Sequence, residues 1–390
     1  MRTAFELADI VRQFRQPYES RYPAGKIPAN ARVLDAIAQC RTSNLGGHLA
    51  QCCSCGAERN SYNSCKNRHC PKCQASARDR WLRAKTSDLL PVPYYHVVFT
   101  IPPCIASIAL QNRRVVYSIL FKASSSALLK LGQEKRHLGA QMGALAVLHT
   151  WGQNLSHHPH VHFIVPAGGL DENGCWKSCR SSKILLPVRV LSRLFRGIFL
   201  SLIRRAHREQ KLQFHGAIKK LACFEDFCSV LKEAKRTEWV VYAKRPFGGP
   251  EQVLTYLGRY THRVAISNQR IVGVGSDGVQ FRWKDYRTGK TNLVQTVDGV
   301  EFLRRFLQHV LPAGFVRIRS FGFLANRRRK KNLQLCRDSL VPIRQAKHSL
   351  KEPLSSKTVI TRPVVVCQNC KSEQWLVLAT ISRPKLWNTS

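Results

Sequence analysis

Two histidines separated by one residue, His160 and His162, are the part of this sequence best suited to chemistry. Side chains on a strand alternate between its faces, so both imidazoles would project from the same face. The apolar run 163–165 follows the pair and would hold the strand in a hydrophobic core. Two imidazoles side by side on a rigid strand are suitable ligands for one divalent metal. The pair therefore predicts a metal site on a buried strand.

A second candidate for chemistry is a pair of tyrosines, Tyr256 and Tyr260. On a helix, residues four apart share a face, and a packed aromatic pair has the same spacing. A free tyrosine has a pKa near 10, so ionising it at pH 7 costs about 4 kcal/mol. Three neighbouring side chains are positioned to supply positive charge: Arg259, His262 and Arg263. A tyrosine activated in this way attacks a phosphodiester and forms a phosphotyrosine, while a metal neutralises the phosphate.

Cysteine and histidine residues with the spacing of metal ligands lie between residues 40 and 73. The candidates are Cys40, His48, Cys52, Cys55, Cys65, His69, Cys70 and Cys73. Eight ligands suffice for two tetrahedral zinc sites, and the two CxxC pairs are typical of structural zinc.

The spacing leaves the partition of these ligands open. In one partition the two CxxC pairs share a zinc ion, and the remaining four residues hold the other. In the second partition the first four ligands bind one zinc ion and the last four bind the other. A further pair, Cys367 and Cys370, has no partner pair nearby in the sequence and is a weaker metal candidate.

The composition indicates a globular protein with a polyanionic partner. The chain has 390 residues, 44% of them hydrophobic, and 63 Lys plus Arg against 23 Asp plus Glu, a net charge of +40. This excess favours nucleic acid over a membrane surface as the partner. No stretch approaches the roughly 18 to 20 apolar residues of a membrane span, and no apolar signal segment begins the chain. We therefore expect a cytosolic protein, in which fifteen cysteines indicate metal binding more than disulfides.

Helices and antiparallel strands alternate along the chain, which predicts an α+β fold. Strands are expected at 94–101, 145–152, 160–165, 239–243 and 316–323, with a hairpin at 271–286. Helices are expected at 105–132, 190–210, 250–260 and 300–310.

Taken together, these patterns resemble the rolling-circle transposases of the insertion sequence ninety-one family. His160-Val161-His162 resembles the HUH motif of single-strand nucleases, and Tyr256 with Tyr260 resembles the paired tyrosines of their two-tyrosine branch. The Cys/His segment 62–74 completes the set. Further matching segments are 151–155, 246–254 and 314–319. The similarity extends from about residue 20 to about residue 340.

The resemblance implies an HUH nuclease core, in which helices flank a central antiparallel sheet, preceded by a small zinc-binding domain. The histidine strand would lie in the middle of the sheet with the tyrosine helix over it. One tyrosine would cleave single-stranded DNA at an element end, giving a 5′-phosphotyrosine and a free 3′-OH, and the second tyrosine would serve a later step. The working metal would be Mg²⁺ or Mn²⁺. Gln153 is the preferred third ligand, ahead of His158 and His149.

Four domains are expected on this basis. A zinc-binding domain would cover residues 1–90, the catalytic domain 91–270, a basic hairpin and helix extension 271–340, and a loosely ordered basic tail 341–390. Two groups of basic residues would contact DNA: Arg259 with Arg263, and the run Arg327, Arg328, Arg329, Lys330 and Lys331. Two other functions remain open from the sequence: a plasmid replication initiator or relaxase of the HUH class, and a non-catalytic zinc-dependent DNA-binding protein.

Overall fold

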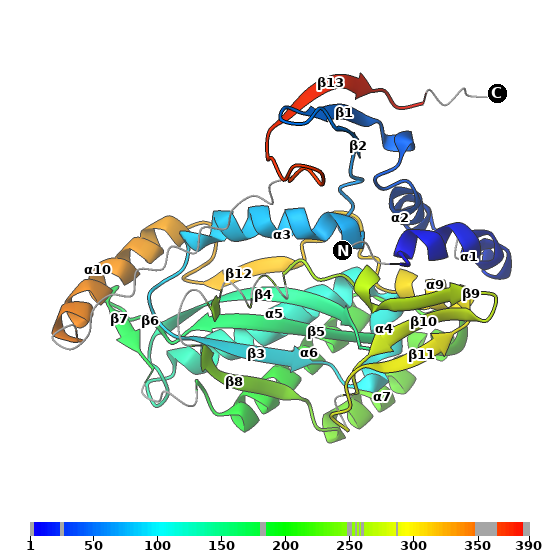
Figure 1. Cartoon of the computed structure of the whole chain (residues 1–390). Helices are drawn as coiled ribbons and strands as arrows, with labels where there is room; N and C mark the ends of the chain where they lie inside the picture. Colours follow the sequence, from blue (N-terminus) through cyan, green and yellow to red (C-terminus); the bar gives the residue numbers. More distant parts are fainter. Residues whose placement is uncertain are drawn as a thin grey trace.

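The main element of the fold is a seven-stranded antiparallel sheet (Figure 1). The computed structural model describes residues 4–23, 27–179, 185–247, 252–253, 256, 258, 261–285, 288–347 and 365–384. The strand order is β7-β6-β4-β5-β3-β8, and β12 also pairs with β4. The strands are β3 (Tyr94–Thr100), β4 (Gln141–Trp151), β5 (His157–Pro166), β6 (Gly168–Leu170), β7 (Trp176–Ser178), β8 (Val241–Phe247) and β12 (Ile318–Gly322). The predicted α+β class, with a central antiparallel sheet flanked by helices, is confirmed.

The histidine strand β5 lies between β4 and β3, in the middle of the sheet. Its odd-numbered side chains, Val161, Phe163 and Val165, are fully buried in one apolar cluster. The same cluster contains side chains of α5 (Arg113–Gln133) and α6 (Val188–Arg208). Because side chains alternate along a strand, His160 and His162 must face the opposite side of the sheet.

That opposite side is covered by α3 (Pro71–Thr86) and by the segment that contains Tyr256. Ile164 of β5 packs there in a second apolar cluster with Leu82 of α3 and with Val253. Tyr256 packs against this cluster and is half-buried. The sheet thus separates an apolar layer of helices from the face that carries the histidines.

The helices behind the sheet include α4 (Ala106–Gln111) and α7 (Phe224–Arg236) in addition to α5 and α6. The sequence predicts one helix over 105–132, and the structure instead breaks it at Asn112. The Asn112 side chain binds the main chain of Ile108 and Gln213, which holds that residue outside helical geometry. Among the described helices, only α5 is long and apolar enough to cross a membrane, and 67% of its apolar window is buried within the protein.

The N-terminal helices share a core with a segment that lies far away in the sequence. The elements of this core are α1 (Leu7–Arg21), α2 (Pro28–Ala38), α9 (Gly299–Leu307) and the sheet of β9 (Ile271–Gly275), β10 (Gly278–Trp283) and β11 (Leu293–Val297). The predicted hairpin is present as β9 and β10, and β11 extends it to three strands. The domain limits expected at 90, 270 and 340 stay predictions.

The last described part of the chain returns to the first. β13 (Trp375–Ile381) pairs with β1 (Gly47–Cys52), which also pairs with β2 (Glu58–Tyr62), as Figure 1 shows. The sequence predicts a loosely ordered tail from 341, and the structure differs: α10 (Arg329–Lys347) and β13 are regular elements. Local patterning missed β13 because its hydrogen-bonding partner is more than three hundred residues away. Short 3-10 helices lie at 43–45, 103–105, 216–222 and 268–270.

Candidate functional site

Three histidines on two adjacent strands converge on the face of the sheet covered by α3. His149 of β4 lies opposite His160 of β5 in the strand register. The candidate ligand nitrogens of His149, His160 and His162 all lie within 4.8 Å of one another. The ring centroids of His160 and His162 are 4.9 Å apart, and those of His149 and His162 are 4.5 Å apart. Three convergent imidazoles form a candidate site for one divalent cation.

The environment keeps the imidazoles of His160 and His162 neutral, which is the protonation state that binds metal. Burial lowers the pKa of His160 to about 4 and that of His162 well below its ordinary value. The charge of Arg263 lowers both values further. His160 Nδ1 donates a hydrogen bond to the His158 carbonyl oxygen at 2.7 Å. This contact fixes the ring and leaves Nε2 as the ligand atom.

The structure brings a third histidine to the pair. His149, ranked below Gln153 and His158 from the sequence, lies with His160 and His162, and the role of Gln153 as a ligand stays a prediction. Gln153 lies in the turn after β4, where its carbonyl oxygen accepts a hydrogen bond from Arg270, and His158 is exposed. The β4–β5 hairpin explains the difference, since its register places His149 directly across from His160. Treating 145–152 and 160–165 as one hairpin would have revealed this from the sequence.

His96 connects the histidine cluster to Tyr256. The Tyr256 hydroxyl lies 2.7 Å from His96 Nε2, and the same Nε2 lies 2.9 Å from His162 Nδ1. Burial lowers the pKa of His96 to about 3, so its ring is neutral. When His162 carries its proton on Nδ1, that N–H donates to His96 Nε2 and leaves His162 Nε2 for the metal. The Tyr256 hydroxyl lies against the same His96 nitrogen, whose single lone pair accepts one hydrogen bond at a time.

Sequence reasoning missed His96, which lies on β3, the other neighbour of β5. The available signal was a histidine inside the predicted strand 94–101, on the face opposite Tyr95, Val97 and Phe99. Tyr260 and Arg259 lie outside the described residues, so their roles stay predictions. Gln252, Val253, Tyr256 and Gly258 have helical geometry, in agreement with a helix in this segment.

A basic cleft opens beside the histidine cluster. Four of its lining residues are positively charged: Lys72, Arg78, Arg263 and Arg270. The buried Arg317 supports this loop by donating hydrogen bonds to the carbonyl oxygens of Thr261 at 3.0 Å and Arg263 at 3.1 Å. His262, expected to add positive charge, does not do so at neutral pH, because burial lowers its pKa to about 4.

The basic run at the start of α10 is mostly exposed. Arg327, Arg328, Lys330 and Lys331 are exposed, as a contact to a DNA backbone requires. Arg329 differs, since it is half-buried and forms an ion pair with Asp88 at 3.3 Å. We therefore assign Arg329 to packing between α10 and the end of α3, and keep the other four residues as candidate DNA contacts.

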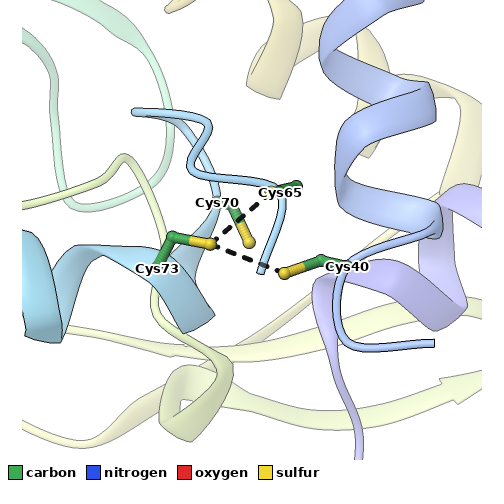
Figure 2. A group of neighbouring side chains, drawn as sticks. All are labelled: Cys40, Cys65, Cys70 and Cys73. Atoms are coloured by element: carbon green, nitrogen blue, oxygen red, sulfur yellow. Dashed lines mark hydrogen bonds between the residues drawn. The ribbon is translucent and has the colours of Figure 1, made fainter. Parts of the chain in front are cut away.

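Four cysteines form the first candidate zinc site, shown in Figure 2: Cys40, Cys65, Cys70 and Cys73. Cys73 Sγ lies 3.5 Å from Sγ of Cys40 and from Sγ of Cys65. A tetrahedron with Zn–S bonds of about 2.3 Å has edges of about 3.8 Å, close to these separations. Cys70 is the N-cap of α3 and Cys73 lies in its first turn, where the helix dipole favours thiolates.

The observed grouping differs from both partitions drawn from the sequence, and neither His48 nor His69 belongs to it. On β1, His48 is four residues from Cys52, about 13 Å along a strand, which is too far to share a metal. His69 is directed elsewhere, because its Nε2 accepts a hydrogen bond from the Leu311 amide at 3.5 Å. The remaining pair, Cys52 and Cys55, lies beside Cys367 and Cys370 at the end of the chain.

Comparison with known proteins finds two family matches along the chain. Residues 10–101 match the family described as "Transposase zinc-binding domain", and residues 143–332 match the family described as "Putative transposase". The "Transposase for insertion sequence element IS801" of Pseudomonas savastanoi pv. phaseolicola is 31% identical over 291 residues, which cover 74% of this chain and 68% of that protein. The "Putative transposase y4qJ" of Sinorhizobium fredii (strain NBRC 101917 / NGR234) is 46% identical over 398 residues and the full length of both proteins.

The chain belongs to the insertion sequence ninety-one family of transposases. No solved structure matches this transposase. The zinc-binding family match covers all seven cysteines between residues 40 and 73, but not Cys367 and Cys370, which lie beside Cys52 and Cys55. His149, His160 and His162 lie within the second family match, whereas His96 lies within the zinc-binding match.

Replacing Cys70 and Cys73 with serine should remove one zinc ion per chain of this transposase. The free energy of unfolding should fall by several kcal/mol, because zinc binding in small modules is worth roughly 10 to 16 kcal/mol. Elemental analysis and chemical denaturation measure the two effects. Cys175→Ser is the matched control, since Cys175 is exposed and lies outside the cluster. Full zinc content in the double variant would contradict the assignment.

Replacing His162 with alanine should weaken Mn²⁺ binding by at least about 100-fold, because it removes a ligand. His96→Ala should weaken binding by about 10- to 100-fold, as is typical for a residue that orients a metal-binding histidine. Titration followed by Mn²⁺ electron paramagnetic resonance measures both. His158→Ala, which removes an exposed histidine next to the cluster, should bind as the unmodified protein does. Equal binding by all three variants would exclude this metal site.

Proposed function

We propose that this transposase cleaves and joins single-stranded DNA at the ends of its element through a 5′-phosphotyrosine on Tyr256. The observation that carries the proposal is the shared contact at His96 Nε2, which lies within hydrogen-bonding distance of Tyr256 Oη and His162 Nδ1. The candidate nucleophile Tyr256 and the candidate metal ligand His162 therefore both contact the side chain of His96. Membership of a transposase family supplies the DNA substrate for that arrangement.

In the proposed step, Tyr256 Oη attacks a backbone phosphorus atom, and the bond from phosphorus to the 3′ oxygen breaks. The phenol proton passes to solvent, and the released 3′ oxygen takes up a proton to become a 3′-OH. Energy stored in the phosphotyrosine bond allows a later 3′-OH to reverse the attack and join two strands. His96 orients the Tyr256 hydroxyl through the 2.7 Å contact between Tyr256 Oη and His96 Nε2.

His149, His160 and His162 are the residues that would hold the catalytic cation. Bound there, a divalent cation would neutralise charge on the scissile phosphate. Imidazole nitrogen suits transition metals better than Mg²⁺, which prefers oxygen ligands, and no carboxylate of the described residues joins this group. Of the two metals expected from the sequence, the ligand set favours Mn²⁺.

The second tyrosine keeps the role expected from the sequence. Tyr260 would lie one helical turn beyond Tyr256 and would serve a second cleavage or the strand transfer. Tyr256 is our candidate for the first attack because its hydroxyl contacts His96. The exposed Arg327, Arg328, Lys330 and Lys331, together with the basic cleft, would contact the DNA backbone.

Two alternatives from the sequence lose support. A plasmid initiator or relaxase would use the same chemistry, but the matching relatives are named as transposases. A non-catalytic DNA-binding protein would not need a tyrosine hydroxyl directed at a histidine cluster. A transposase of this kind would act where the DNA is, in the bacterial cytosol.

Tyr256→Phe should abolish the covalent protein–DNA adduct, because phenylalanine lacks the attacking oxygen. The measurement uses labelled single-stranded element ends with Mn²⁺, followed by a denaturing gel. Tyr62→Phe is the control, because it removes a tyrosine hydroxyl from β2, outside the histidine site. It should form the adduct at the normal level. His96→Gln should slow adduct formation yet leave its yield at long times intact. An adduct that persists in Tyr256→Phe but is lost in Tyr260→Phe would reverse the order of the tyrosines.

Replacing Arg78 and Arg263 with glutamine should weaken single-stranded DNA binding and reduce its salt dependence. Each lost phosphate contact lowers the slope of log K against log salt by about 0.7, so the double variant should lose about 1.4. Fluorescence anisotropy across a salt series measures the slope. Arg136→Gln, which removes an exposed arginine paired with Glu134, is the control for the loss of a positive charge outside the cleft, and its slope should not change. An unchanged slope would exclude the cleft as the path of the strand.

A further inference from the structure

Two CxxC pairs from opposite ends of the chain meet in space. Cys52 Sγ lies 3.5 Å from Cys370 Sγ, and Cys55 Sγ lies 3.6 Å from Cys367 Sγ. All four sulfur atoms lie within 4.8 Å of one another. The members of the first contact are 318 residues apart in the sequence.

The two pairs have the same loop geometry. In the first loop, the Gly56 amide donates to the Cys52 carbonyl oxygen at 2.9 Å, and the Cys52 amide donates to Ala57 at 2.9 Å. In the second loop, the Lys371 amide donates to the Cys367 carbonyl oxygen at 3.0 Å, and the Cys367 amide donates to Ser372 at 2.8 Å.

The residue after the second cysteine also matches between the loops. Gly56 has a φ of 70° and Lys371 has a φ of 63°, so both adopt the left-handed conformation. This conformation is uncommon for a residue other than glycine, and Lys371 adopts it at the position equivalent to Gly56. Two loops with the same hydrogen bonds and the same turn, facing each other through four sulfur atoms, form a paired-knuckle metal site.

A three-stranded sheet holds the two loops together. β1 ends at Cys52, which is paired with Trp375 at the start of β13, and the Cys53 amide donates to the Gln374 carbonyl oxygen at 3.1 Å. The pairing continues to Gly47 opposite Ile381. A small antiparallel sheet with two CxxC loops at one end is the arrangement of a zinc ribbon.

Apolar packing alone offers little to hold the tail in this position. Most side chains of β13 are exposed, including Leu376 at 58% and Val377 at 57%. Cys52 and Cys367, each 1% exposed, are the most buried side chains of the two loops. A small sheet without a substantial core needs a metal or a covalent link to remain folded.

We propose that Cys52, Cys55, Cys367 and Cys370 bind one structural zinc ion, which fastens the C-terminal strand to the N-terminal domain as a zinc ribbon split between the two ends of the chain. Cys367 and Cys370 lie outside both family matches, which cover 10–101 and 143–332. The N-terminal domain is therefore completed by residues from the opposite end of the chain.

Distances and local hydrogen bonds favour zinc over the other possible links. The sulfur separations exceed a disulfide bond length of about 2.05 Å and are close to the roughly 3.8 Å edge of a Zn–S₄ tetrahedron. The amides of Ser54 and Cys55 face the Cys52 sulfur. Amides directed at sulfur stabilise the thiolate, which is the form that binds zinc.

The test counts zinc per chain in the full-length protein by elemental analysis. All variants are made in a His160→Ala/His162→Ala background, so that metal at the histidine cluster is not counted. Cys52→Ser/Cys55→Ser and Cys367→Ser/Cys370→Ser should each reduce the count from two to one. The variant that combines all four substitutions should still retain one zinc ion, because both pairs hold the same metal. Cys53→Ser is the matched control and should retain two, since Cys53 lies between the ligands but outside the cluster.

Three results would overturn the proposal. A count of two in Cys367→Ser/Cys370→Ser would show that the tail supplies no ligands. Loss of both zinc ions in the combined variant, with one lost in each pair, would show that the two pairs bind different metals. Iron in place of the second zinc ion would show that the site has another occupant. The tail variant alters no residue of the first zinc site, so a general failure to fold would appear as loss of both ions from that variant, whereas the proposal expects the loss of one.

Discussion

Side-chain alternation along β5 is the constraint on which the active face depends. Val161, Phe163 and Val165 are locked into the apolar layer formed with α5 and α6, so the residues between them must face α3. A shift of one residue in the strand register would bury imidazoles among aliphatic side chains and expose Phe163. The apolar core, with no help from a metal, therefore fixes where His160 and His162 stand. The β4 pairing then brings His149 across from His160, and the β3 pairing brings in His96.

The buried polar groups at this site contact one another, which reduces the cost of their burial. His96, His149 and His162 are each less than a tenth exposed, and isolated polar groups at that depth would be costly. Hydrogen-bonding contacts link His96 to His162 and Tyr256, while burial keeps the rings of His96 and His162 neutral. Such a network is stiff, since moving one ring breaks contacts with the others. The same stiffness suits a nucleophile that must meet a phosphate in one orientation.

Local patterns in the sequence predicted those features of the fold and site that depend on residues close together in the chain. The α+β class, the histidine strand, the β9–β10 hairpin and the family resemblance all follow from motifs a few residues long. What escaped was non-local: His96 and His149 reach the site through strand pairing, and Cys367 reaches Cys55 through β13. The zinc ligands show the difference most clearly, since the sequence predicts the number of ions but not their partition. His48 and His69 have suitable side chains, yet a strand and a backbone contact direct them elsewhere.

The joining of the two chain ends also sets an order of events during synthesis. Cys52 leaves the ribosome 318 residues before Cys370, an interval of about 15 to 60 s at ordinary rates of translation. During that interval the site of Cys52 and Cys55 lacks two of its four ligands, while the first zinc site, whose ligands end at Cys73, can already close. A chain that terminates before Cys367 would contain the entire seven-stranded sheet but would lack β13 and both cysteines of the second loop. The N-terminal domain would thus acquire its second zinc ion only after the ribosome has synthesised the chain as far as Cys370.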